Sequence, residues 1–168
     1  MEQLVKVVEK VAEKYLDKLS VIIAENKLVA NYVITINNKT EIYKTLHIEQ
    51  FENQLKITVF PERLEKVTDL AGLEDIIQIL EKQSSVKELT QEEVQQIKEK
   101  YVAGLKVELI KMYDLQAPPP KTRGFIDFVD DAGTLHIRWE NGSSLGLVVG
   151  VDEFKVICPL CNEEFEVF

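Results

Sequence analysis

Apolar residues recur at helical spacing at the N-terminal end of the chain. Charged residues, mostly Lys and Glu, fill the positions between them, so one stripe is apolar and the rest is solvated. This pattern predicts an amphipathic helix, whose apolar residues are Leu4, Val7, Val8, Val11, Ala12, Tyr15 and Leu19. Residues 20–26 fit either an extension of that helix or a short strand, and both alternatives stay open.

From Leu28 onward the apolar period changes to two, which is typical of strands with one buried face. Three alternating runs, separated by turn residues at 37–38 and 52–53, predict a three-stranded antiparallel meander. Pro61 ends the last of these strands, because a proline cannot donate a hydrogen bond to a ladder. A second amphipathic helix follows, with one apolar face formed by Leu73, Ile76, Ile77 and Leu80.

The downstream part of the chain has its own signals. Thr90 and Glu93 have the spacing of a capping box, so a helix is expected to begin at residue 91, and Gly104 is placed to end it. The sharpest alternation of the chain follows at 135–149, where Asn141-Gly142 supplies the residues of a two-residue hairpin turn. Residues 106–112 and 124–129 predict two further strands. Short strands at this density suit a small, closed, SH3-like β-barrel.

These elements predict an α+β chain of two parts. Residues 1–83 are expected to form a domain of a helix, a three-stranded antiparallel sheet and a helix, with the helices on one face of the sheet. Residues 84–90 are polar and predict a linker. Residues 91–168 are expected to form a helix, the SH3-like β-barrel and a C-terminal Cys-x-x-Cys tail.

Two groups of residues in the barrel segment are candidates for binding a partner. Trp139 is expected to face the core, whereas His136, Arg138 and Glu140 point outward, either as a contact patch or as an ordinary solvated face. The loop before the second strand is stiff, because each proline ring fixes φ. This loop and the residue that opens the strand form the second group, which is Pro118, Pro119, Pro120 and Arg123.

The net charge of −9 bears on the class of partner. An acidic surface repels phosphate backbones and attracts basic protein surfaces, so direct nucleic-acid binding is disfavoured and protein binding is favoured. No apolar run approaches the roughly 20 residues that a membrane span needs, and we expect a cytoplasmic protein. No nucleophile elbow, phosphate-binding loop or dinucleotide glycine pattern is present, so no enzymatic activity is expected.

The chain has two cysteines, Cys158 and Cys161, whose spacing resembles one knuckle of a zinc ribbon. Structural zinc takes four ligands, so this half-site needs completion by His47 and His136, by a second copy across a dimer axis, or by a partner. A reduced turn that holds no metal is the preferred interpretation, and zinc is the one cofactor that the sequence suggests.

Several short motifs between residues 90 and 154 are similar to a small bacterial family of unassigned function, found in phages and conjugative elements of low-GC Gram-positive bacteria. The most specific is W-x-N-G-S-S-L at 139–145, and the others are QAPPP at 116–120, TRG at 122–124, VDDAGT at 129–134 and GVD at 150–152. Lys121 departs from the family, which usually has glycine before Thr-Arg-Gly. Residues 1–83 match no family that we recognise.

The resemblance implies a genetic context and no chemistry, because a family or fold does not define a function by itself. Small acidic proteins of mobile elements include inhibitors of host defence. The expected function is therefore a non-enzymatic interaction protein that binds and inhibits a host CRISPR–Cas complex of the Cas9 type or a restriction complex. One alternative is an adaptor that binds a peptide or an element-encoded protein, and another is nucleic-acid binding by the barrel.

Overall fold

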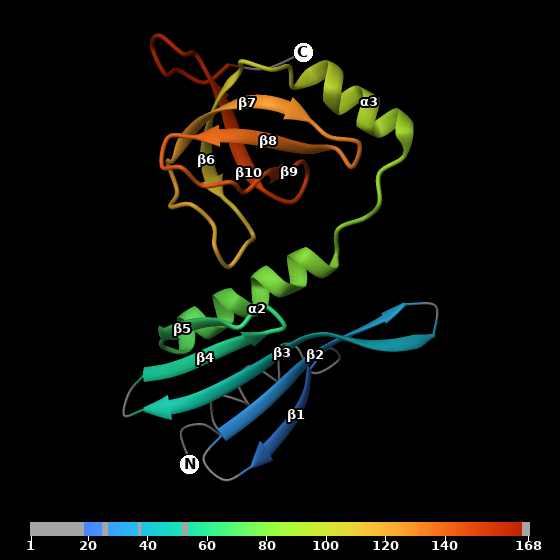
Figure 1. Cartoon of the computed structure of the whole chain (residues 1–168), viewed down its shortest axis with the longest axis vertical. Coiled ribbons are helices and arrows are strands. Elements are labelled where there is room, and N and C mark those ends of the chain that lie inside the picture. Colours follow the sequence, from blue (N-terminus) through green and yellow to red (C-terminus); the bar gives the residue numbers. More distant parts are fainter. Residues whose placement is uncertain (1–18, 25–26, 37, 52–53, 166–168) are drawn as a thin grey trace. The chain divides into compact units, whose positions relative to one another are not determined.

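The structure is a computed structural model that describes residues 19–24, 27–36, 38–51 and 54–165 (Figure 1). The chain divides into two compact units, Met1–Ser84 and Ser85–Phe168. The helix predicted for the N-terminal end lies outside the described residues, apart from Leu19. That residue begins strand β1 (Leu19–Ala24). Of the two alternatives for residues 20–26, the strand is therefore correct for residues 20–24.

The N-terminal unit contains a five-stranded antiparallel sheet in the order β1-β2-β3-β4-β5. The three predicted strands are its central members, and β1 and β5 extend it on either side. Strand β5 escaped prediction because it is a short edge strand with few apolar residues, and its Val67 is 63% exposed. The other strands are β2 (Lys27–Ile36), β3 (Lys39–Phe51), β4 (Gln54–Phe60) and β5 (Leu64–Thr68).

Helix α2 (Leu70–Ser84) packs on this sheet with the apolar face that the sequence predicts. Its start is fixed by Asp69, whose carboxylate accepts a hydrogen bond from the amide of Gly72 at 3.1 Å. Burial of each large apolar side chain contributes about 1.5–3 kcal/mol. The apolar face therefore supplies most of the free energy that holds the helix on the sheet. Its buried residues are Leu73, Ile76, Ile77 and Leu80.

The C-terminal unit begins with helix α3 (Gln91–Lys100), and its capping box is confirmed. The amide of Glu93 donates to the Thr90 hydroxyl at 3.3 Å, and the amide of Thr90 donates to the Glu93 carboxylate at 2.7 Å. The helix ends at Lys100 with Tyr101 as its C-cap, so the prediction that Gly104 ends it is wrong. In the described part of the chain, no helix is long and apolar enough to cross a membrane.

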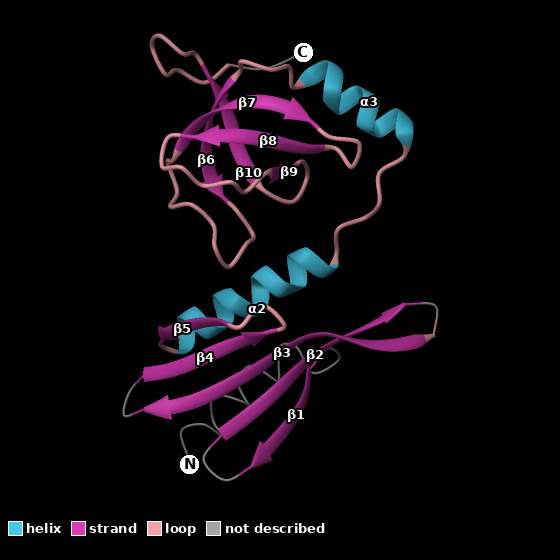
Figure 2. Cartoon of the chain, viewed as in Figure 1, coloured by secondary structure: helices cyan, strands magenta, loops and turns pink. Residues whose placement is uncertain are grey.

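A second five-stranded antiparallel sheet follows, in the order β10-β6-β7-β8-β9. The mixed α+β class is confirmed by two helices and two antiparallel sheets in the described residues (Figure 2). The closed SH3-like barrel is not confirmed, because the described sheet ends at β9 and β10 without a ladder between them. The strands are β6 (Lys106–Lys111), β7 (Arg123–Val129), β8 (Thr134–Trp139), β9 (Leu147–Val148) and β10 (Glu153–Ile157).

The hairpin between β8 and β9 is real, but the predicted two-residue turn is wrong. Strand β8 ends at Trp139 and β9 begins at Leu147, so the seven residues 140–146 connect the two strands. A type I′ turn would need positive φ at both central residues, whereas φ is positive at Gly142 and not at Asn141. The longer connection lets the Trp139 indole donate to the backbone carbonyl of Leu145 at 2.6 Å.

The core of the C-terminal unit lies on the inner face of its sheet, and Trp139 is buried there as predicted, at 4% exposure. Gly124 pairs with Trp139 across β7 and β8. A Cβ atom at residue 124 would lie 2.6 Å from Cγ2 of Ile137 and 2.8 Å from the carbonyl oxygen of Arg138. The close approach of these two strands therefore requires glycine.

Candidate functional site

The outer face of the C-terminal sheet gathers aromatic and charged side chains, and we call these residues the outer face. They alternate along β6, β7 and β8 with the buried residues of the core. The ladder registers place them in cross-strand rows, in which Lys106 and Arg138 flank Phe125, and Arg123 and Lys155 flank Glu108. The outer face comprises Lys106, Glu108, Arg123, Phe125, Asp127, Phe128, His136, Arg138, Glu140 and Lys155.

Phe128 is the most exposed large apolar residue of this face, at 54%. A register shift between Ile126 and Phe128 turns its ring outward, opposite His136. The two rings stack with centroids 4.3 Å apart and an interplanar angle of 9°. An exposed aromatic pair of this kind offers a flat surface to a binding partner.

Asp130 holds His136 in this position. One carboxylate oxygen of Asp130 lies 3.0 Å from His136 Nε2, and the other accepts the backbone amides of Ala132 and Thr134, both at 2.9 Å. Burial opposes ionisation of Asp130, but the hydrogen bonds from His136, Thr134 and Ala132 outweigh it and lower the pKa of this carboxyl. Asp130 is therefore an orienting residue for the aromatic pair.

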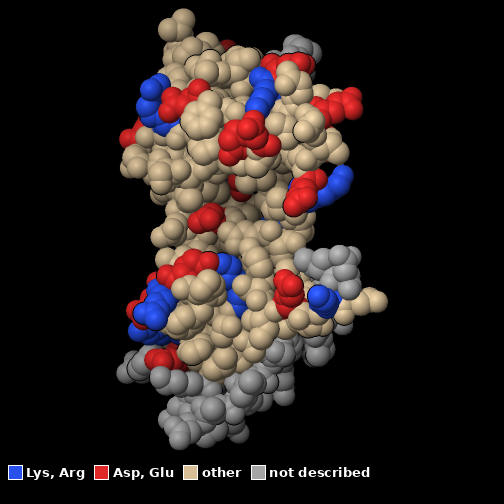
Figure 3. All heavy atoms as spheres, turned by 45° about the vertical axis from the view of Figure 1, so that its right-hand side comes forward, with Lys and Arg blue, Asp and Glu red and all other residues tan. Residues whose placement is uncertain are grey.

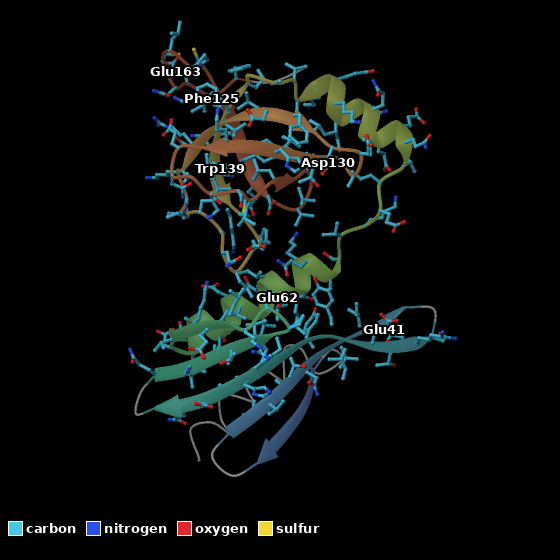
Figure 4. All side chains as sticks on the ribbon, viewed as in Figure 1. Glu41, Glu62, Phe125, Asp130, Trp139 and Glu163 are labelled. Carbon is cyan, nitrogen blue, oxygen red and sulfur yellow. The ribbon has the colours of Figure 1, made fainter. Side chains whose placement is uncertain are left out.

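Phe125 lies one row further along the face (Figure 4). The ammonium group of Lys106 sits 5.8 Å from the centroid of its ring, within the range of a cation–π contact. On its other side stands Arg138, whose guanidinium lies 3.5 Å from the Asp127 carboxylate. The row thus combines one aromatic ring with two cationic side chains.

Glu108 is the centre of the third row, and its side chain is only 12% exposed. It binds Arg123 Nε at 2.8 Å with one oxygen and Lys155 Nζ at 3.0 Å with the other. The hydrogen bonds from Arg123 and then Lys155 lower the pKa of the Glu108 carboxyl, despite its partial desolvation. These two ion pairs tie β6 to β7 and to β10.

The outer face carries four cations and three carboxylates, and one of these, Glu108, is shared by Arg123 and Lys155. Each cation thus has a carboxylate within 4.0 Å, the remaining pair being Lys106 and Glu140. Elsewhere too, Lys and Arg side chains lie next to Asp and Glu on the visible part of the C-terminal unit (Figure 3). A surface of this kind attracts neither a polyanion nor a polycation strongly.

Four of the seven predicted partner-binding residues lie together on the outer face, namely Arg123, His136, Arg138 and Glu140. The three prolines lie in the loop that precedes β7. Pro118 is buried, whereas Pro119 and Pro120 are exposed.

That loop ends in a tight turn. The amide of Thr122 donates to the carbonyl of Pro119 at 3.2 Å, with Pro120 and Lys121 as central residues. Lys121 has φ of 70°, the left-handed value that the third position of a type II turn requires. Glycine accepts this value freely and lysine does not, so the backbone at Lys121 is strained.

Sequence reasoning missed the two phenylalanines of the outer face. Strict alternation from Gly124 through Ile126 places Phe128 inside, and only the register shift moves it out. No local signal in the sequence marks a bulge at this point. For Phe125 a signal existed, because it alternates with Gly124 and Ile126 and so had to face outward with Arg138.

The two cysteines lie in a hairpin that continues β10 beyond the sheet, next to Glu163 (Figure 4). Both thiols are free, and Cys161 is exposed. Among the residues that the structure describes, no three His, Cys, Asp or Glu side chains form a group that could hold a metal ion. No third ligand joins the two cysteines in these residues, and closure of the half-site by His47 and His136, by a second copy or by a partner stays a prediction.

Comparison with known proteins finds one similarity, which lies in the C-terminal unit. Residues 90–157 match the family model described as a domain of unknown function (DUF4314), over less than half of the chain. The search of curated proteins and the search of solved structures each found no match. The part of the resemblance that is confirmed is that the C-terminal part of the chain is similar to a family of unknown function. An origin in mobile elements stays a prediction.

Proposed function

We propose that the chain is a non-enzymatic interaction protein that binds a protein partner through the outer face. The observation that carries this proposal is the exposed Phe128–His136 stack beside Phe125 and Arg138. Aromatic residues and arginine are the types most enriched at the energetic centres of protein interfaces. Asp130 and Glu108 hold the surrounding side chains in place, which lowers the entropy that binding would cost.

A protein partner is favoured over nucleic acid by the charges of this face. Phosphate binding depends on uncompensated cations, whose number sets both affinity and salt dependence. On the outer face each of the four cations has a carboxylate within 4.0 Å, with Glu108 serving two of them, and the chain as a whole carries −9. We therefore expect no retardation of DNA or RNA by the chain at low salt. A salt-dependent shift would instead establish the nucleic-acid alternative.

The specific partner that we propose is a host defence complex, either a CRISPR–Cas complex of the Cas9 type or a restriction complex, in the cytoplasm of a bacterium. The support is the resemblance to proteins of phages and conjugative elements, together with the acidity of the chain. An acidic protein is attracted to the positively charged channel that holds guide and target in such effectors.

The test is an inhibition assay with a guide-loaded Cas9-type effector and, in parallel, a restriction enzyme. Wild-type chain in molar excess should reduce DNA binding or cleavage. The double variant Phe128→Ala, Arg138→Ala should lose most of this effect, because both side chains project from the fold. Val67→Ala is the matched control, since Val67 is equally exposed but lies in the N-terminal unit.

Full activity of every enzyme at large excess of the chain would overturn the inhibitor proposal and leave the binding proposal to be tested by itself.

A pull-down with the wild-type chain and the same double variant distinguishes an inhibitor of a host complex from an adaptor. If proteins encoded by the mobile element, and no host proteins, are recovered by the wild type and lost by the variant, the chain is an adaptor. Equal recovery by both chains would exclude the outer face as the binding surface.

A further inference from the structure

The chain beyond β10 forms a hairpin whose turn contains both cysteines, and it follows directly on the segment that matches the family model. The amide of Cys158 donates to the carbonyl of Glu163 at 2.8 Å, and Ile157 forms a bridge with Glu164. The amide of Asn162 donates to the carbonyl of Cys158 at 2.9 Å, and Asn162 has φ of 59°. Asparagine tolerates this left-handed conformation better than most residues.

The turn is arranged around the sulfur atoms. The Cys158 sulfur accepts hydrogen bonds from the backbone amides of Cys161 and Leu160, and its thiol also contacts the Cys161 thiol. Amides directed at a sulfur stabilise the thiolate, which is the form that binds a metal. The ammonium group of Lys106 lies 3.0 Å from the side-chain oxygen of Asn162, so a positive charge stands beside the turn.

The same turn is open to another molecule. Cys161 is exposed, and Leu160, between the two cysteines, is 92% exposed. Phe165 is also exposed, on the returning strand of the hairpin, where its amide donates to the carbonyl of Val156 at 3.2 Å. Exposed apolar residues beside a ligand pair are what a contact between two chains would cover.

We propose that Cys158 and Cys161 supply two of the four thiolate ligands of a zinc ion, and that the same two residues of a second copy supply the others. Zinc in structural sites is tetrahedral and favours thiolates, and two ligands from one turn are half of such a set. The described residues of one chain offer no group of three ligands. A two-fold dimer, the commonest symmetric assembly, provides an identical pair without any new residue.

The experiment uses the full chain without a histidine tag, reduced and freed of metal. Titration with Co²⁺ should produce thiolate charge-transfer absorption and the visible bands of a tetrahedral site, and saturation should occur at one metal ion per two chains. Addition of Zn²⁺ to the cobalt-loaded chain should abolish the cobalt bands. Addition of Zn²⁺ to the metal-free chain should double the mass measured by light scattering. A chelator should restore the monomer mass.

Two variants and a control locate the ligands. Cys158→Ser and Cys161→Ser should each abolish the cobalt bands and the mass change, with unchanged far-UV circular dichroism. Glu163→Gln should keep both, because the Glu163 carboxylate lies 3.8 Å from the Cys161 sulfur and is not proposed as a ligand. Loss of binding in Glu163→Gln would overturn the four-thiolate set.

Two further results would overturn the proposal. Saturation at one metal ion per chain with no change of mass would show a site that is not shared between copies. Absence of the thiolate–cobalt bands in the reduced wild-type chain would show that the hairpin holds no metal.

Discussion

The two sheets of this chain differ in how their order relates to the sequence. In the N-terminal unit every strand pairs with the next strand along the chain, whereas in the C-terminal unit β10 pairs with β6, the first strand of its sheet. Pairing between successive strands needs only hairpins, while pairing of β10 with β6 closes a long segment of chain. Among the described strands, those distant in the sequence pair only in the C-terminal sheet, and the candidate site lies there.

The faces of the two sheets differ as well. Helix α2 packs against the N-terminal sheet with a continuous apolar stripe. The C-terminal sheet buries its apolar residues on the inner face and carries aromatic rings and ion pairs on the outer face. Aromatic rings that remain exposed in a rigid setting are a more specific sign of binding than apolar residues scattered over a surface.

The largest expected effects come from one core substitution in each unit, Trp139→Ala and Ile57→Ala. Both side chains are buried, at 4% and 0% exposure. We expect Trp139→Ala to lower the free energy of unfolding of the C-terminal unit by about 3–5 kcal/mol, and Ile57→Ala that of the N-terminal unit by about 2–5 kcal/mol. Hydrogen exchange read by mass spectrometry under increasing urea measures the two units separately.

If each substitution changes only the exchange of its own unit, the comparison of two independent sheets holds. If Ile57→Ala also accelerates exchange in β6 to β10, the two units unfold together and the division into separate cooperative units is wrong.

A smaller and opposite effect is expected for Lys121→Gly. Relief of the left-handed backbone gains about 1–2 kcal/mol, and the greater freedom of glycine in the unfolded chain costs about 0.5–1 kcal/mol. The net result should be a stabilisation of the C-terminal unit of up to about 1 kcal/mol, measured by urea unfolding. Lys121→Ala is the control and should give no gain, because alanine keeps the unfavourable φ of 70°.

The smallest effect concerns the pH dependence that Glu108 brings to the C-terminal sheet. Since its pKa is lowered in the folded chain by Arg123 and Lys155, its contribution to stability is present above the unfolded-state pKa. It is lost as the pH falls through the folded-state pKa. Glu108→Gln should therefore cost no more than about 1 kcal/mol at neutral pH and nothing in strong acid. Urea unfolding at both pH values measures the difference in free energy of unfolding between wild type and Glu108→Gln. An equal difference at neutral and acid pH would contradict the role of the ionised Glu108 carboxylate.

Much of the fold could be predicted because its signals are local. Periodicity located α2, its four buried residues and the central strands, and the Thr90 capping box located the start of α3. The edge strands β5 and β10 were missed because they are short. A strand that pairs on one side only carries little alternation to recognise.

The candidate site was predictable only in part. Outward alternation in β8 found His136 and Arg138, but their setting depends on contacts across strands. The Asn141-Gly142 turn failed because Leu145 must reach the Trp139 indole, and Phe128 was missed because a bulge reverses its direction. Both are tertiary effects that override a local pattern.

The position of β10 beside β6 also bears on the synthesis of the chain. A ribosome delivers residues in order, and the sheet of the N-terminal unit is complete once β5 has emerged. The C-terminal sheet lacks an edge member until residue 157 has been made, so β6 exposes unpaired backbone groups throughout that interval. Premature termination before β10 would consequently leave the edge of β6 unpaired and able to pair with another chain. Chaperones and proteases would then act on a product with a complete first unit and an incomplete second one.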